Sequence, residues 1–120
     1  MHEVSLARNI VEIVREHLSP ESACEVQSVT VRIGELAGVI PESLEFCFRA
    51  LTQGTALEHT SLIIRREPIK ARCENCGRKS LITIDSFKCP VCGSNYLTLL
   101  AGTELRVSEI ETVDIPVPST

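Results

Sequence analysis

The chain has 120 residues, of which 43% are hydrophobic but only 3% aromatic, and its formal net charge is −4. This length fits one domain, or a domain with a small appendage, and its core must be aliphatic. The negative charge argues against nucleic acid as the main partner of the whole chain. No apolar run is long enough to cross a bilayer, and the N-terminus lacks the basic and apolar regions of a signal peptide. We therefore expect a cytoplasmic protein, and because disulfides are rare there, its six cysteines need another role.

The first predicted element is a helix over residues 4–18. Its apolar side chains recur at intervals of three and four, which is typical of a helix with one buried face: Val4, Ala7, Ile10, Val11, Val14 and Leu18. Pro20 marks the end of this helix. A strand with one buried face comes next, because Val29, Val31 and Ile33 alternate with polar residues.

A second helix is predicted to begin at Pro41, since proline suits the first helical position. Its apolar face comprises Leu44, Cys47, Phe48 and Leu51. Gly54 supplies an end signal. The place of Cys47 on this face favours a small buried apolar side chain over a reactive or metal-binding thiol.

Two further strands are expected at residues 61–67 and 103–111, and Pro68 ends the first of them. The segment between them, residues 69–100, has a different composition, with five basic and two acidic side chains. Its charge of +3 leaves −7 for the remainder of the chain. We therefore expect an α/β core with a basic segment inserted between two of its strands.

The predicted domain boundaries follow from this change in composition. The core comprises residues 1–68 and 101–115, the insert comprises residues 69–100, and residues 116–120 form a flexible tail. The insert is too small to bury an adequate core unaided, so something besides apolar packing must stabilise it.

Four cysteines of the insert form two matching pairs, in the sequences Cys-Glu-Asn-Cys-Gly (residues 73–77) and Cys-Pro-Val-Cys-Gly (residues 89–93). Two residues between paired thiolates let both sulfurs reach one tetrahedral ion, and the glycine permits the backbone turn that aims amides at sulfur. Four thiolates and no water favour a closed, structural Zn(II) site. Two disulfides, a redox pair or iron are the alternatives that the spacing leaves open. The expected fold class is therefore α+β, with two helices packed on a small three-stranded sheet and an inserted zinc-ribbon domain.

The chain start is a second candidate metal site. The Met1 amine, the His2 amide and the His2 imidazole can close adjacent chelate rings on one cation, and such nitrogens suit Ni(II) or Cu(II). The bulky His2 helps to retain Met1, because processing enzymes generally remove methionine only before a small residue. These residues alone do not distinguish a metal site from an ordinary N-terminus.

The same residues leave other classes of function open. A zinc ribbon can be a purely structural adaptor, a nucleic-acid-binding module or a thiol redox centre. Phe87 and Tyr96 are the only aromatic residues of the insert, too few for a base-stacking platform. No glycine-rich phosphate loop, nucleophile elbow or helical zinc-protease motif occurs, so we do not expect an enzyme.

Taken together, these motifs resemble the HypA/HybF family of hydrogenase nickel-incorporation (maturation) proteins. The resemblance covers nearly the whole chain. It rests on Met-His-Glu-Val-Ser-Leu at residues 1–6, Arg-Ile-Gly-Glu-Leu at 32–36, Pro-Glu-Ser-Leu-Glu-Phe at 41–46, and the two cysteine pairs. The order and spacing of these motifs are what make it specific, because each of them alone is common.

The resemblance implies a nickel metallochaperone that delivers Ni(II) to the large subunit of [NiFe]-hydrogenase during maturation, together with a HypB-type GTPase. Some family members also serve urease, so urease maturation proteins are further implied partners. By the family's pattern, Ni(II) is the transferred cargo and is held by Met1, His2 and Glu3. A structural Zn(II) is held by Cys73, Cys76, Cys89 and Cys92. The alternative from the residues is a zinc-ribbon adaptor or nucleic-acid-binding module with no nickel role.

Overall fold

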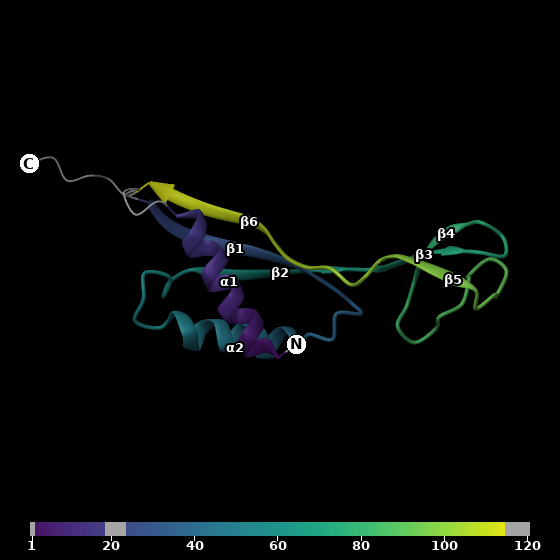
Figure 1. The fold of residues 1–120 in the computed structure, drawn as a ribbon, viewed down its shortest axis with the longest axis horizontal. Helices are drawn as coiled ribbons and strands as arrows, with labels where there is room; N and C mark the ends of the chain where they lie inside the picture. Colours follow the sequence, from purple (N-terminus) through teal and green to yellow (C-terminus); the bar gives the residue numbers. More distant parts are fainter. Residues whose placement is uncertain (1, 19–23, 115–120) are drawn as a thin grey trace, which may run out of the picture. The chain divides into compact units, whose positions relative to one another are not determined.

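The computed structural model describes residues 2–18 and 24–114 (Figure 1). Met1, residues 19–23 and residues 115–120, which include the predicted tail at 116–120, lie outside the described residues. The chain divides into two compact units. The first unit comprises the described parts of residues 1–31, 39–64 and 107–120, and the second comprises residues 32–38 and 65–106.

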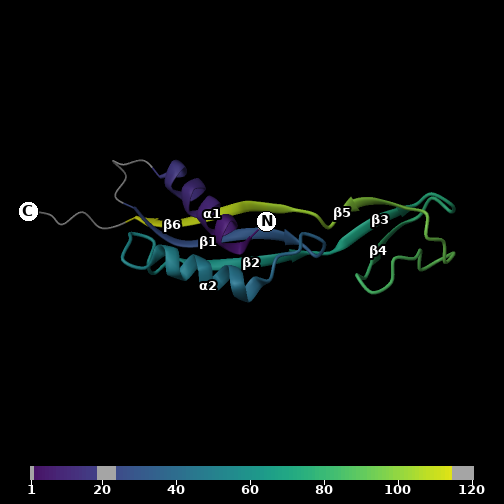
Figure 2. The same cartoon turned by 60° about the horizontal axis from the view of Figure 1, so that its bottom comes forward.

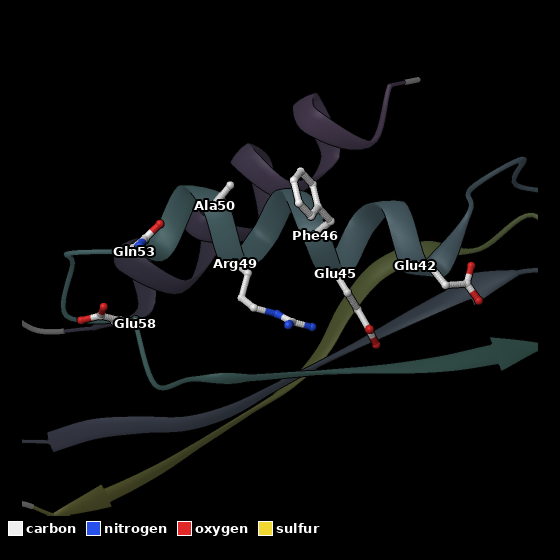
Figure 3. A pocket seen from close by; sticks show the side chains of 7 residues that line it. All are labelled: Glu42, Glu45, Phe46, Arg49, Ala50, Gln53 and Glu58. Carbon is white, nitrogen blue, oxygen red and sulfur yellow. The ribbon is translucent and has the colours of Figure 1, made fainter.

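The first unit contains both helices, α1 (Glu3–His17) and α2 (Pro41–Thr52). They lie on the same side of a three-stranded sheet (Figure 3). The strand order of this sheet is β2 (Ser61–Glu67), β1 (Cys24–Gly34) and β6 (Leu105–Asp114) (Figure 2). The predicted α+β class, with two helices packed on a small three-stranded sheet, is confirmed.

Hydrogen bonds give the directions of the three strands. Near the start of both β1 and β2, Thr60 Oγ1 donates a hydrogen bond to Val26 O at 2.8 Å. Near the end of both strands, Glu35 N donates to Glu67 O at 3.0 Å. These two strands are therefore parallel, as expected when a helix connects them. The strand β6 runs antiparallel to β1, because Ser108 Oγ donates to Thr30 O at one point and Gly34 N donates to Glu104 O at another.

The core of the first unit is aliphatic apart from Phe48, as its low aromatic content predicts. The buried apolar side chains of the two helices are Leu6, Ala7, Ile10, Val11 and Val14 in α1, and Leu44 and Phe48 in α2. Two details of the predicted helix faces are wrong. Val4 is 47% exposed because it lies in the first turn of α1, and Leu6 is buried in its place. Cys47 is only half-buried, since Leu44 and Phe48 occupy the centre of the apolar face.

The second unit contains a separate antiparallel sheet whose strand order is β4 (Lys79–Ile82), β3 (Ile69–Cys73) and β5 (Leu97–Ala101). Its hydrophobic cluster consists of Ile69, Ala71 and Ile82, with the partly buried Leu36 and Leu97 packed against it. Pro68 separates β2 from β3, which begins immediately after it. This cluster has only three buried side chains, so its apolar burial stabilises the unit weakly.

Gly34, at the end of β1, lies against the backbone of Gly102. A Cβ atom at Gly34 would be 2.0 Å from Gly102 O, so no larger residue fits without a backbone shift. Two backbone hydrogen bonds of 2.8 Å fix this approach, from Gly34 N to Glu104 O and from Leu36 N to Gly102 O. The close approach of the two backbones therefore explains the glycine in the motif Arg-Ile-Gly-Glu-Leu at 32–36.

The described chain forms two helices, and neither α1 nor α2 is long and apolar enough to span a membrane.

Candidate metal centre

The second unit brings four cysteine sulfurs together. The Sγ atoms of Cys73, Cys76, Cys89 and Cys92 all lie within 4.8 Å of one another. Two of the distances are 3.5 Å, between Cys73 and Cys92, and 3.7 Å, between Cys76 and Cys89. Both exceed a disulfide bond of about 2.0 Å, so the sulfurs are not paired as disulfides here. They fit one tetrahedral ion with metal–sulfur bonds of about 2.3 Å, whose ligands lie about 3.8 Å apart.

Each cysteine pair sits in a tight turn that closes on its glycine. Gly77 N donates to Cys73 O, and Gly93 N donates to Cys89 O, both at 2.8 Å. The two glycines have φ angles of +79° and +76°, in the region that side chains with a Cβ rarely adopt. This backbone aims amides at sulfur, as Cys76 N does toward Cys73 Sγ at 3.5 Å. The predicted role of the glycines in the turns is confirmed.

The amides change the acidity of the thiols. The amide of Cys92 is the main cause that lowers the pKa of Cys89 to about 6, and the amide of Cys76 lowers the pKa of Cys73. The pKa of Cys76 rises to about 11, because the effect of the Arg78 amide, which lowers it, is outweighed by desolvation and by the neighbouring sulfurs. Two sulfurs therefore favour the thiolate, while a third resists ionisation beside them. A cation bound between the sulfurs removes that repulsion.

The buried and exposed members of the cluster alternate. Cys73 and Cys89, the first cysteine of each pair, are buried, whereas Cys76 and Cys92 are exposed. Among the residues that the structure describes, these four are the one group of three or more His, Cys, Asp or Glu side chains placed to hold a metal ion. With four sulfur donors the set is complete for a tetrahedral ion, which is the arrangement of a structural rather than a catalytic site.

The predicted N-terminal site is described in part. His2 is exposed and precedes the first residue of α1 with an extended backbone (φ −76°, ψ 144°). Its carbonyl accepts the amide of Leu6 at 3.0 Å, while its side chain makes no capping hydrogen bond. The imidazole is therefore accessible from solvent. Met1 lies outside the described residues.

Glu3 makes a contact that the sequence did not reveal. Its Oε1 accepts the backbone amide of Ile40 at 3.2 Å. Ile40 immediately precedes α2, so the carboxylate sits at the positive end of that helix. The Ile40 amide is also the main reason that the pKa of Glu3 lies below its usual value. This contact joins the starts of α1 and α2 across 37 positions of sequence, and no local pattern could have predicted it.

A hollow of about 710 Å³ lies along α2, but its side chains do not meet at one point (Figure 3). Phe46 and Ala50 project from one side of the helix, whereas Glu45 and Arg49 project from the other. Phe46 is 73% exposed. The arrangement brings no nucleophile, acid and base together around a common centre.

Comparisons with known proteins match nearly the whole chain. A family model described as "Hydrogenase/urease nickel incorporation, metallochaperone, hypA" matches residues 1–112. A protein named "Hydrogenase maturation factor HypA" from Geobacter sulfurreducens is 42% identical over 111 residues, which are 92% of this chain and 98% of that relative. The protein of the same name from Geotalea daltonii is 41% identical over 113 residues, or 94% and 100% of the two chains.

A solved structure shares the fold. The solution structure of the Ni metallochaperone HypA from Helicobacter pylori gives a TM-score of 0.64 at 22% identity, and the match covers 96% of this chain and 100% of that one. At this identity the likeness shows a shared fold alone.

Proposed function

The chain belongs to the HypA family of hydrogenase and urease nickel-incorporation metallochaperones, and from this premise we propose that it delivers Ni(II) to the large subunit of [NiFe]-hydrogenase. The observation that carries the proposal is that the four sulfur donors and the exposed N-terminal histidine belong to different units of the chain. Four sulfurs in the second unit complete one tetrahedral site, while the exposed His2 belongs to the first unit. A saturated site suits a resident ion, and an open terminal site suits a transferred one.

In this proposal the resident ion is Zn(II), held by Cys73, Cys76, Cys89 and Cys92. Its contribution is structural, because the second unit buries only Ile69, Ala71 and Ile82 in its apolar cluster. Structural zinc supplies roughly 10–16 kcal/mol of apparent binding free energy in small domains, which exceeds what so small a core provides. We also propose that residues 69–100 depend on this ion for their fold, as a zinc-ribbon domain.

The cargo is Ni(II), held at the N-terminus by Met1, His2 and Glu3. The Met1 amine, the His2 amide and the His2 imidazole supply nitrogen donors, which suit Ni(II). Glu3 keeps the segment beside the start of α2 through its contact with Ile40. Because nitrogen-bound protons must leave when the ion binds, nickel binding weakens as the solution becomes more acidic.

Transfer requires partners, since the chain has no phosphate-binding loop of its own. We propose that a HypB-type GTPase supplies nucleotide hydrolysis, that the hydrogenase large subunit accepts the ion, and that urease maturation proteins are a second class of acceptor. The exchange takes place in the cytoplasm, where unpaired cysteines persist.

Nickel calorimetry on untagged, zinc-loaded protein tests the proposal. We expect His2→Ala to abolish nickel binding and to leave one zinc per chain, because the two donor sets share no residue. His59→Ala is the matched control, since His59 is an exposed histidine in a turn outside the N-terminal segment. Extra residues before Met1 should have the same effect as His2→Ala, because they remove the free amine.

The delivery step is tested separately, by incubating nickel-loaded protein with purified nickel-free hydrogenase large subunit and measuring nickel in the large subunit. Wild-type protein should transfer the ion and His2→Ala should not. Normal nickel affinity in His2→Ala would refute the binding site, and normal binding without transfer would refute the acceptor.

A further inference from the structure

One face of the β4-β3-β5 sheet carries an unusual set of side chains. Residues of β3 alternate between buried and exposed, and the exposed ones are Lys70 and Arg72. Across the strand pairs, Arg72 lies opposite Lys79 of β4 and Thr98 of β5, and Lys70 lies opposite Leu81 of β4. Because paired residues in a sheet project to the same side, these five side chains share one surface. We call it the basic face: Lys70, Arg72, Lys79, Leu81 and Thr98.

The charges on the basic face are poorly balanced. The carboxylate of Glu74 accepts hydrogen bonds from Arg72 Nε at 3.2 Å and Thr98 Oγ1 at 2.6 Å, so it partly neutralises Arg72. Within the described parts of the chain, Lys70 and Lys79 form no ion pair. The face therefore presents an excess of positive charge although the whole chain is negative.

The pairing of Arg72 with Lys79 is unfavourable for the sheet itself. Side chains directly opposite each other on neighbouring strands have Cβ atoms about 5 Å apart, and like charges there destabilise the pair. An acidic residue at position 79 would replace this repulsion with an attraction to Arg72. The bond from Arg72 Nε to Glu74 gives Arg72 a structural role, but no ion pair among the described residues gives one to Lys79.

An exposed apolar side chain lies among these cations. Leu81 is 64% exposed and sits opposite Lys70 in the register. A ligand that fits both features must carry carboxylates for the lysines and an aliphatic group that covers Leu81. An acidic segment of a protein, with leucine or isoleucine between its carboxylates, has this chemistry.

We propose that the basic face docks such an acidic, aliphatic segment of a partner protein. Lys70 and Lys79 pair with its carboxylates, and Leu81 packs against its aliphatic side chain. Nucleic acid fits less well, because the face carries no aromatic side chain for base stacking and residues outside 69–100 sum to −7, which repels a long polyanion. The proposal concerns the second unit and does not depend on nickel.

The test uses full-length, zinc-loaded, ¹⁵N-labelled protein and a synthetic ten-residue peptide of alternating glutamate and leucine, at low salt. We expect the peptide to shift amide resonances of β3 and β4 on the basic face. The double variant Lys70→Glu/Lys79→Glu should raise the peptide's dissociation constant at least about tenfold, because two attractive pairs become repulsive. The matched control is Arg65→Glu/Arg66→Glu, which makes the same change in net charge at two exposed residues of β2.

Several results would overturn the proposal. One is an equal loss of affinity in the control, which would mean that net charge alone governs binding. Another is tighter binding of a ten-nucleotide single-stranded DNA than of the peptide. A third is self-association without peptide that the double variant abolishes, since the occupant would then be a second copy of the chain.

A single substitution separates docking from a structural role. Lys79→Glu should weaken peptide binding and yet raise the midpoint of thermal unfolding of the second unit by about 2 °C, because it replaces a repulsive pair with an attractive one. A structural lysine would give the opposite result, with a lower midpoint and unchanged peptide affinity.

Discussion

The two units of this protein are stabilised by different physical means. The first buries seven apolar side chains of α1 and α2, which form an ordinary apolar core. The second buries only Ile69, Ala71 and Ile82 in its cluster, yet places four sulfurs within 4.8 Å of one another. Where a segment is too short to bury a core, metal ligation can replace apolar burial. Each unit should therefore respond to a perturbation that the other tolerates.

The largest effect is expected from loss of the metal. Under the proposed zinc site, Cys73→Ala removes a buried ligand, and structural zinc in small domains contributes roughly 10–16 kcal/mol of apparent binding free energy. We expect the amide spectrum of residues 69–100 to collapse to that of an unfolded chain, while the helical circular dichroism of α1 and α2 persists. The control is Cys47→Ala, a half-buried cysteine of α2 outside the cluster, which should retain one zinc per chain. A folded spectrum for residues 69–100 in Cys73→Ala would show that the second unit does not depend on metal ligation for its fold.

The converse perturbation removes packing from the first unit. Leu44 is fully buried in α2, and Leu44→Ala leaves a cavity that should cost about 2–5 kcal/mol of unfolding free energy. Denaturant titration followed by helical circular dichroism measures this cost. Zinc content should stay at one ion per chain, since no cysteine ligand lies in the first unit. If zinc were lost together with helical stability, the two units would be unfolding as one.

A smaller effect is expected where Gly34 and Gly102 meet. Gly34→Ala would place a Cβ atom 2.0 Å from a backbone oxygen, and overpacking of this kind typically costs about 1–3 kcal/mol. We expect a lower midpoint of denaturant unfolding with zinc still bound. Gly38→Asn is the control, because Gly38 has φ +73° with open space around it and asparagine tolerates that conformation. Equal stability of Gly34→Ala and wild type would show that the backbone shifts enough to accommodate the added Cβ atom.

Much of this architecture could be predicted from local patterns. The spacing of apolar residues predicted α1 and α2, and alternation predicted the centre of β1 and part of β6, because helices and strands repeat every 3.6 and two residues. A short apolar run predicted β2. The paired cysteines predicted a four-sulfur cluster, since ligand spacing within a turn is also a local property. What the sequence missed is non-local. The early start of β1 at Cys24 depends on pairing with other strands. The division of the insert into β3, β4 and β5 also depends on pairing, although Ile69–Cys73 alternates between apolar and basic residues.

Two contacts show the limit of sequence reasoning at the level of single residues. Gly34 and Gly102 are 68 positions apart, so the sequence shows the two glycines but not the backbone contact that requires Gly34. The bond between Glu3 and the Ile40 amide likewise depends on how α1 and α2 meet. The register of β3 with β4, which sets Arg72 opposite Lys79, could be read only once the strands were paired.

The smallest effect concerns Glu3 and tests a single hydrogen bond within the first unit. The Ile40 amide holds the pKa of Glu3 below its ordinary value of 4.5, so the bond's contribution to stability is present above pH 4.5 and is lost as the pH falls through the lower, folded-state pKa. We expect the Ile40 amide resonance to move with pH, with a midpoint below 4.5. Glu3→Gln should abolish this movement, whereas Glu12→Gln, an exposed glutamate on the same helix, should leave it in place. A midpoint at or above 4.5 would mean that the Glu3 carboxylate does not accept the Ile40 amide in solution.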